Sequence, residues 1–176
     1  MNRREAIRNI IVFTGGVTFL PAYAGSEGRA SVALNNINIS AQQEKLLAII
    51  AATLIPKTDT PGADETGAHL FVLKMVDDCY EKADQDKFVG GLDQLEQAAQ
   101  KRFGKSMLKC SVADRQKLLQ EVENKDGFAP EVYAFYQIMK QRTIQGYMTS
   151  RYVLDNIKHY TIIPAVKYDG YHRIEN

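Results

Sequence analysis

A proline-bounded break between two apolar runs is the feature that most constrains how this chain can fold. The break reads Leu-Ile-Pro-Lys-Thr-Asp-Thr-Pro-Gly-Ala over residues 54–63. Pro56 and Pro61 lack a backbone donor, and each disfavours the helical conformation of the residue before it. Asp59 can hydrogen-bond to the local backbone, and Gly62 adds conformational freedom just after the second proline. We therefore expect two helices joined by an extended, turning loop.

Apolar side chains recur at threes and fours on both sides of this loop, which is the period of an amphipathic helix. The pattern predicts helices over about 41–55, 68–82, 85–103, 111–124, 130–147 and 149–157. Gly90 and Gly91 interrupt the third of these and predict a kink or a close helix contact. No segment shows convincing period-two alternation. We therefore expect an all-α fold, a single domain of five to six helices with an irregular C-terminal tail.

The amino terminus has the pattern of an export signal. Arg3 and Arg4 precede a short apolar run, and Ala22 and Ala24 form the small-residue pattern of a cleavage site. Adjacent arginines are typical of the twin-arginine route, which exports folded proteins. The alternatives are an ordinary signal with a chance arginine pair, or an uncleaved anchor, although the apolar run is shorter than the roughly 20 residues that span a bilayer.

This reading divides the chain into three parts and predicts a periplasmic protein. Residues 1–24 are the twin-arginine-type signal peptide, and the polar, asparagine-rich residues 25–39 are a flexible leader. Residues 40–176 are the helical domain with its wrapping C-terminal tail. The formal net charge of the whole chain is +1, which gives no electrostatic support for binding nucleic acid.

The two cysteines, Cys79 and Cys110, leave two alternatives open. In an oxidising periplasm they could form a disulfide, or they could be two separate buried thiols. Two cysteines are too few for a zinc site of the usual type, and neither belongs to a haem-attachment motif.

The sequence offers little to support catalysis within this chain. His69, His159 and His172 are not at metal-ligand spacing from one another, and no serine or cysteine lies in a known nucleophile motif. No glycine-rich dinucleotide fingerprint is present, so we expect no flavin or nicotinamide bound to this chain. An enzyme acting through His69 or Cys79 is kept as an alternative.

The tyrosines favour a protein partner. Seven of the nine lie at or after residue 133, and tyrosine is favoured where one protein packs on another. Packing within the chain would account for some of them. The predicted partner interface comprises Pro56, Asp59, Pro61, Tyr147, Tyr152, Tyr160, Tyr168 and Tyr171.

Four segments of the sequence together carry a resemblance to a known family: residues 51–63, the triplet Asp78-Cys79-Tyr80, residues 143–150 and residues 164–171. They resemble the gluconate 2-dehydrogenase subunit 3 family, and residues 143–150 are similar to its Gly-Tyr-aromatic-Thr-Ser segment. Residues 164–171 look like its closing segment. Met148 replaces a common aromatic residue and Tyr171 replaces a frequent cysteine, so the family branch, and with it the sugar, stays open.

The resemblance implies a non-catalytic small subunit of a periplasmic sugar or sugar-acid dehydrogenase, such as a gluconate 2-dehydrogenase or a glucoside 3-dehydrogenase. The large subunit would be a flavoprotein of the glucose–methanol–choline type that holds FAD, and in some systems a cytochrome c subunit carries the electrons onward. The small subunit is expected to assist folding of the flavoprotein and to lend it an export signal. The rival hypothesis is a free-standing periplasmic helical binding domain.

Overall fold

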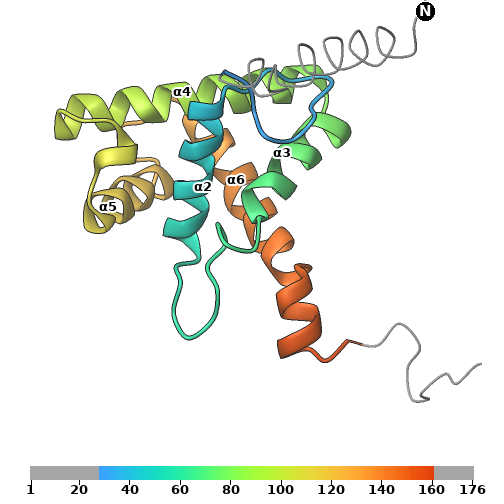
Figure 1. Ribbon diagram of the computed structural model, residues 1–176. Helices are drawn as coiled ribbons and strands as arrows, with labels where there is room; N and C mark the ends of the chain where they lie inside the picture. Colours follow the sequence, from blue (N-terminus) through green and yellow to red (C-terminus); the bar gives the residue numbers. More distant parts are fainter. Residues whose placement is uncertain (1–27, 161–176) are drawn as a thin grey trace, which may run out of the picture.

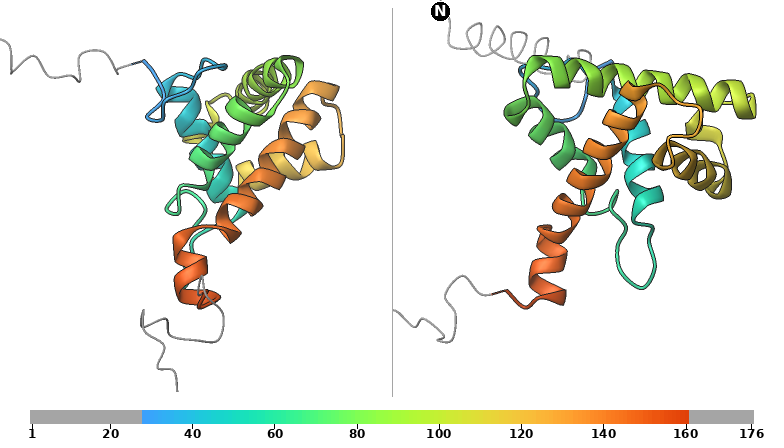
Figure 2. Two further views of the ribbon diagram at one scale, coloured as in Figure 1. Left: turned by 90° about the vertical axis from the view of Figure 1, so that its right-hand side faces the viewer. Right: turned by 180° about the vertical axis from the view of Figure 1, so that it is seen from behind.

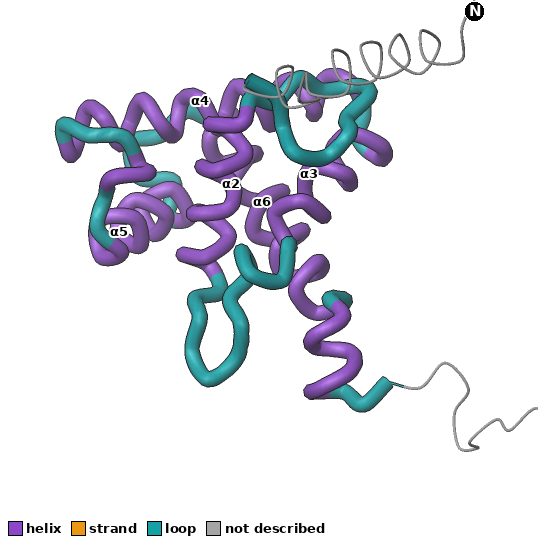
Figure 3. The backbone as a smooth tube through the Cα atoms, viewed as in Figure 1, coloured by secondary structure: helices purple, strands orange, loops and turns teal. Residues whose placement is uncertain are grey.

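The computed structural model describes residues 28–160, which consist of helices and the loops that join them (Figures 1 and 3). Its elements are α2 (Ala41–Leu54), α3 (Ala68–Cys79), α4 (Lys82–Phe103), the 3-10 turn η1 (Met107–Lys109), α5 (Val112–Glu123), α6 (Pro130–Met148) and the π-helical segment η2 (Val153–Ile157). No strand occurs in the described part of the chain. The predicted all-α fold is therefore confirmed, with most helix ends within a few residues of the prediction.

Capping boxes fix the starts of two helices, α2 and α5. The Ser40 hydroxyl accepts from the Gln43 N–H at 3.1 Å, and the Gln43 side chain accepts in return from the Ser40 N–H. Ser111 and Asp114 form the same reciprocal pair ahead of α5. Each pair satisfies two backbone donors that a helix start otherwise leaves without a partner.

The boundary between α3 and α4 differs from the prediction by three residues on each side, because the intervening chain is extended at Tyr80. The side chain of Gln85, which is itself buried, stabilises this early end. Its Nε2 atom donates, at 3.0–3.1 Å, to three carbonyls at the end of α3, those of Val76, Asp77 and Tyr80. These carbonyls would otherwise lack helical partners, so the break is stable although the apolar pattern runs through it.

α6 packs mainly against α4 and α3 and lies between α5 and α3 (Figures 1 and 2). At the crossing with α4, a Cβ atom on Gly91 would lie 2.5 Å from Phe135 Cβ and 2.6 Å from the Glu131 carbonyl oxygen. The rings of Phe88 and Phe135 pack beside it with centroids 5.0 Å apart. The predicted close contact is thus confirmed at Gly91, whereas Gly90 faces open space.

The prediction of a flexible leader over residues 25–39 is wrong for its described part. Ile37 and Ile39 are buried in the core, and Ala30, Val32 and Leu34 pack against it. The polar residues of this segment are typical of a flexible leader, but apolar residues alternate with them and pack into the core. Residues 30–39 are therefore a strap across the helices and form part of the domain.

Asp77 of α3 fastens this strap. Its buried carboxylate accepts backbone N–H groups from Asn35, Asn36 and Ile37 at 2.8, 2.7 and 3.0 Å. Burial by itself would raise the pKa of Asp77, but the three N–H donors and nearby Lys74 outweigh it and lower the pKa. Asp77 therefore stays charged and holds the strap.

The opposite end of the molecule carries two projections (Figures 1 and 3). One is the loop between α2 and α3, which contains the two prolines. The other is an arm made of residues 150–160, which includes η2 and packs mainly against α6. Among residues 28–160, no helix is both long enough and apolar enough to cross a membrane.

Candidate functional site

The proline loop is held in one shape by its own hydrogen bonds. The Ala63 N–H donates to the Ile55 carbonyl at 3.0 Å and closes the base of the loop. Lys57 Nζ lies 2.8 Å from Glu65 Oε1, which ties the two sides together. A Cβ atom on Gly62 would lie 2.8 Å from Asp64 Oδ1 and 3.0 Å from the Lys57 backbone nitrogen, so this tight path favours glycine.

Tyr147 connects the loop to α6. Its hydroxyl donates to the Pro61 carbonyl at 3.2 Å and lies 3.3 Å from the Thr60 hydroxyl. The preceding residue, Gly146, lets α6 come close to α3, because a Cβ atom there would lie only 2.8 Å from Phe71 Cδ1. The close approach of the two helices brings the tyrosine within reach of the loop.

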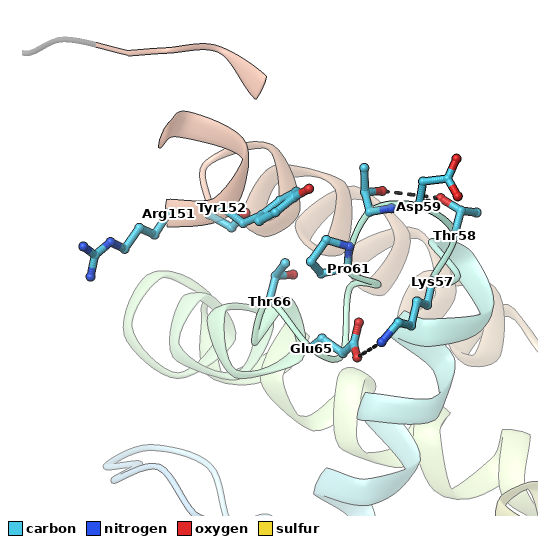
Figure 4. A pocket seen from close by; sticks show the side chains of 10 residues that line it. Lys57, Thr58, Asp59, Pro61, Glu65, Thr66, Arg151 and Tyr152 are labelled. Carbon is cyan, nitrogen blue, oxygen red and sulfur yellow. Dashed lines mark hydrogen bonds and ion pairs between the residues drawn. The ribbon is translucent and has the colours of Figure 1, made fainter. Parts of the chain in front are cut away.

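A cleft of about 610 Å³ separates the loop from the arm (Figure 4). Tyr152 extends toward Pro61 from the arm side. The complete lining consists of Lys57, Thr58, Asp59, Thr60, Pro61, Glu65, Thr66, Ser150, Arg151 and Tyr152. Most of the lining residues carry a hydroxyl or a charged group, and Tyr152 and Pro61 add an aromatic ring and a proline ring for apolar contact.

Contacts at both of its ends hold the arm, residues 150–160. The Ser150 hydroxyl accepts from the Val153 N–H at 3.4 Å, and Val153 is the buried residue that anchors the arm. Arg151 pairs with Asp155 at 3.2 Å on the outer side. The last backbone hydrogen bond runs from the Tyr160 N–H to the Leu154 carbonyl at 2.8 Å. The arm is therefore ordered up to its tip although little of it is buried.

The structure brings together five of the eight residues that the sequence assigned to a partner interface. Pro56, Asp59, Pro61, Tyr147 and Tyr152 all lie on or beside the loop. A sixth, Tyr160, lies at the tip of the arm and is exposed. The remaining two, Tyr168 and Tyr171, lie outside the described residues, as do the export-signal residues Arg3, Arg4, Ala22 and Ala24.

Three exposed apolar residues near this end are not among the predicted interface residues. Ile144 and Met148 lie one helical turn apart on α6, and Ile157 lies on the arm. Ile144 fits the apolar stripe of its helix, so the pattern by itself assigns it to the core. The available signal was the spacing of four between Ile144 and Met148, which places both on one helix face.

The other candidate residues form no shared site. Cys79 is exposed at the end of α3 and Cys110 is buried after η1, and both are free thiols, so the disulfide alternative is not realised. Burial also raises the pKa of the Cys110 thiol. His69 is half-buried, its Nδ1 atom has no hydrogen-bond partner, and burial lowers its pKa despite Glu44 and Asp64. Residues 28–160 contain no group of three or more acidic, histidine or cysteine side chains placed to hold a metal ion.

A family model described as gluconate 2-dehydrogenase subunit 3 matches residues 41–165. This chain belongs to the gluconate 2-dehydrogenase subunit 3 family. The matched range includes every helix from α2 to η2, and therefore both walls of the cleft and the Tyr147 contact between α6 and the loop. No curated protein and no solved structure matches the chain.

Proposed function

We propose that the chain is the non-catalytic small subunit of a periplasmic FAD-dependent sugar or sugar-acid dehydrogenase. It would assist folding of the flavoprotein large subunit and its export by the twin-arginine route. Membership of a family described as subunit 3 of a dehydrogenase supports a role inside a complex of several chains. In some systems of this kind a cytochrome c subunit completes the complex.

The proposal rests on the surface at the end of the molecule that carries the proline loop and the arm. It combines an internally braced loop, an ordered projecting arm and several exposed apolar side chains. Such a surface suits binding to another protein, since a preformed loop loses little conformational freedom on association.

We place the FAD in the partner, which would be a flavoprotein of the glucose–methanol–choline type. The sequence of this chain has no glycine-rich dinucleotide fingerprint. The arginine pair at positions 3 and 4 complements such a partner, because the twin-arginine route carries proteins that are already folded and loaded with cofactor. One signal on the small subunit would then export both chains.

The first test replaces the export signal in cells that make both subunits. Arg3→Lys with Arg4→Lys should leave both chains in the cytoplasm, because the twin-arginine route depends on the arginine pair. Arg8→Lys is the matched control, since it changes a nearby arginine and keeps the pair. Normal amounts of flavoprotein in the periplasm of the double variant would refute the export role.

The second test is a pull-down of the chain from its native periplasm. We expect a co-purifying flavoprotein that shows flavin absorbance and reduces a dye when the right sugar is added. The sugar that supports dye reduction would identify the substrate. A colourless chain purified alone would instead favour a free-standing binding domain, for which the cleft of about 610 Å³ has a size common among ligand sites.

A further inference from the structure

We infer that the flavoprotein docks on one particular face of this subunit, which we call the docking face. It consists of the loop residues 56–61, the arm residues 150–160, and the exposed α6 side chains Ile144 and Met148. Its occupant is a folded protein surface with an apolar centre and charged groups of both signs at the rim. The inference rests on the proposed function and adds to it the site of contact.

The distribution of exposed apolar side chains singles out this face. Within residues 28–160 the large hydrophobic residues with substantial exposure are Val112 (54%), Ile144 (45%), Met148 (42%), Ile157 (51%) and Tyr160 (61%). All but Val112 fall between residues 144 and 160. Scattered single exposures are normal on soluble proteins, but several along one short stretch indicate an interaction surface.

The loop adds a rigid element to the apolar side chains. The loop is held by the hydrogen bond at its base, by the ion pair between Lys57 and Glu65, and by the Tyr147 hydroxyl. Exposed residues in such a loop can contact a partner without first being ordered, which reduces the entropic cost of binding. Tyr147 is therefore a positioning residue for the loop that the partner touches.

The charges favour a protein over a lipid surface. Arg151 and Asp155 pair on the arm, and Lys57 and Glu65 pair on the loop, so both signs are present on both projections. Asp59 is exposed and takes part in none of the ion pairs among the described residues. An anionic membrane attracts clusters of basic residues, which this mixed rim is not. A protein partner with a basic side chain opposite Asp59 would complement it.

The last described residue, Tyr160, lies on the docking face. The described chain ends at Tyr160, at the tip of the arm, and 16 more residues follow it. They include Ile162, Ile163 and two tyrosines, Tyr168 and Tyr171. The sequence that follows the last described residue therefore contains residue types that binding surfaces favour.

The first variant pair tests the apolar part of the face. In the co-expressed complex, Ile157→Ser with Tyr160→Ser should weaken binding of the flavoprotein by at least about 10-fold, as expected for buried apolar and tyrosine contacts at an interface. Val112→Ser is the matched control, because Val112 is as exposed but lies on α5, and we expect unchanged binding. Binding is measured as the dissociation constant of the purified complex, and far-UV circular dichroism checks that each variant is folded.

The second pair tests the role of Tyr147. Tyr147→Phe removes only the hydroxyl that holds the loop and should weaken the complex several-fold with little change in unfolding temperature. Tyr136→Phe is the control, since its hydroxyl donates to Glu123 and not to the loop. It should leave binding unchanged although it too loses a hydrogen bond. Equal binding by both variants would overturn the positioning role.

The outcomes separate this inference from the proposed function. If the wild-type chain binds no flavoprotein, the proposed function fails and the inference with it. If the wild type binds but the arm variant binds equally well, only the docking face is wrong. The inference is also overturned if the arm variant loses self-association instead, or if it loses binding to phosphatidylglycerol vesicles while the flavoprotein complex is unaffected.

Discussion

The contact between α4 and α6 at Gly91 gives a sharp prediction for stability. Gly91→Ala adds a single carbon atom, which would lie 2.5 Å from Phe135 Cβ and 2.6 Å from the Glu131 carbonyl oxygen. Ordinary contacts of a Cβ atom begin at about 3.4 Å, so the two helices must move apart by roughly 1 Å. One of the opposing atoms belongs to the backbone, so a side-chain rotation alone cannot relieve the clash.

The change in unfolding free energy caused by Gly91→Ala combines two opposing effects. Overpacking a well-packed core costs about 1–3 kcal/mol, and the backbone clash places this site toward the upper end. Replacing glycine by alanine inside a helix returns about 0.5–1 kcal/mol. We therefore expect Gly91→Ala to lower the free energy of unfolding by about 2 kcal/mol. For a chain of this size that corresponds to an unfolding temperature lower by about 4–8 °C.

Gly90→Ala is the matched control in the same helix. A Cβ atom there meets nothing within 4 Å, so only the gain in helix propensity remains. Its unfolding free energy should rise by about 0.5–1 kcal/mol. The two adjacent substitutions, identical in chemistry, should thus shift stability in opposite directions.

The assay is urea unfolding of the purified protein, followed by circular dichroism at 222 nm, for the wild type and both variants. Equal slopes of the three transitions would show that the compared states expose similar surface. The reasoning is refuted if Gly91→Ala is as stable as Gly90→Ala, because the close packing of α4 on α6 would then not exist.

Two further predictions concern the strap and the cysteines. Asp77→Asn should cost about 2–4 kcal/mol of unfolding free energy at pH 7, because the charged acceptor of three backbone N–H groups is lost. The pKa of Asp77 is lowered in the folded protein, so its contribution to stability is complete above the unfolded pKa of about 4 and is lost as the pH falls through the lower folded value. Urea unfolding of the wild type and the variant at pH 7 and pH 3 should show that the difference in unfolding free energy shrinks in acid. A difference that stays constant would contradict this account. For the cysteines, a thiol reagent should label Cys79 alone in the native protein and both thiols after denaturation, since Cys110 is buried and burial raises its pKa. Failure to label either cysteine in denaturant without a reductant would indicate a disulfide after all.

The helices could be predicted from the sequence because their signals are local. Ser40 and Ser111 carry complete capping boxes, and the prolines mark breaks that the backbone has to follow. The predicted boundary between α3 and α4 lies three residues too late in the sequence. The actual boundary depends on the Gln85 side chain, which donates to carbonyls of the preceding helix. A side-chain contact of that kind leaves no periodic trace in the sequence.

The candidate site was predictable in its residues but not in its shape. The two prolines and Tyr147 were assigned to an interface from composition and resemblance, yet nothing local indicates that the tyrosine hydroxyl reaches Pro61, which is 86 positions away. The strap was misread for a related reason. Its polar residues look disordered in isolation, and nothing local indicates that the buried carboxylate of Asp77, some 40 residues later, accepts backbone N–H groups from Asn35 and Ile37.

The strap also fixes where the described chain enters the fold relative to the proline loop. Gly28, the first described residue, accepts a hydrogen bond from the Ala41 N–H, so the chain enters the fold at the start of α2. The proline loop begins where α2 ends, 14 residues later, or about 21 Å along the helix axis. Figure 1 shows the strap and the loop at opposite poles of the bundle. A protein bound at the proline loop would therefore leave the strap, and the point where the described chain enters the fold, uncovered at the opposite pole.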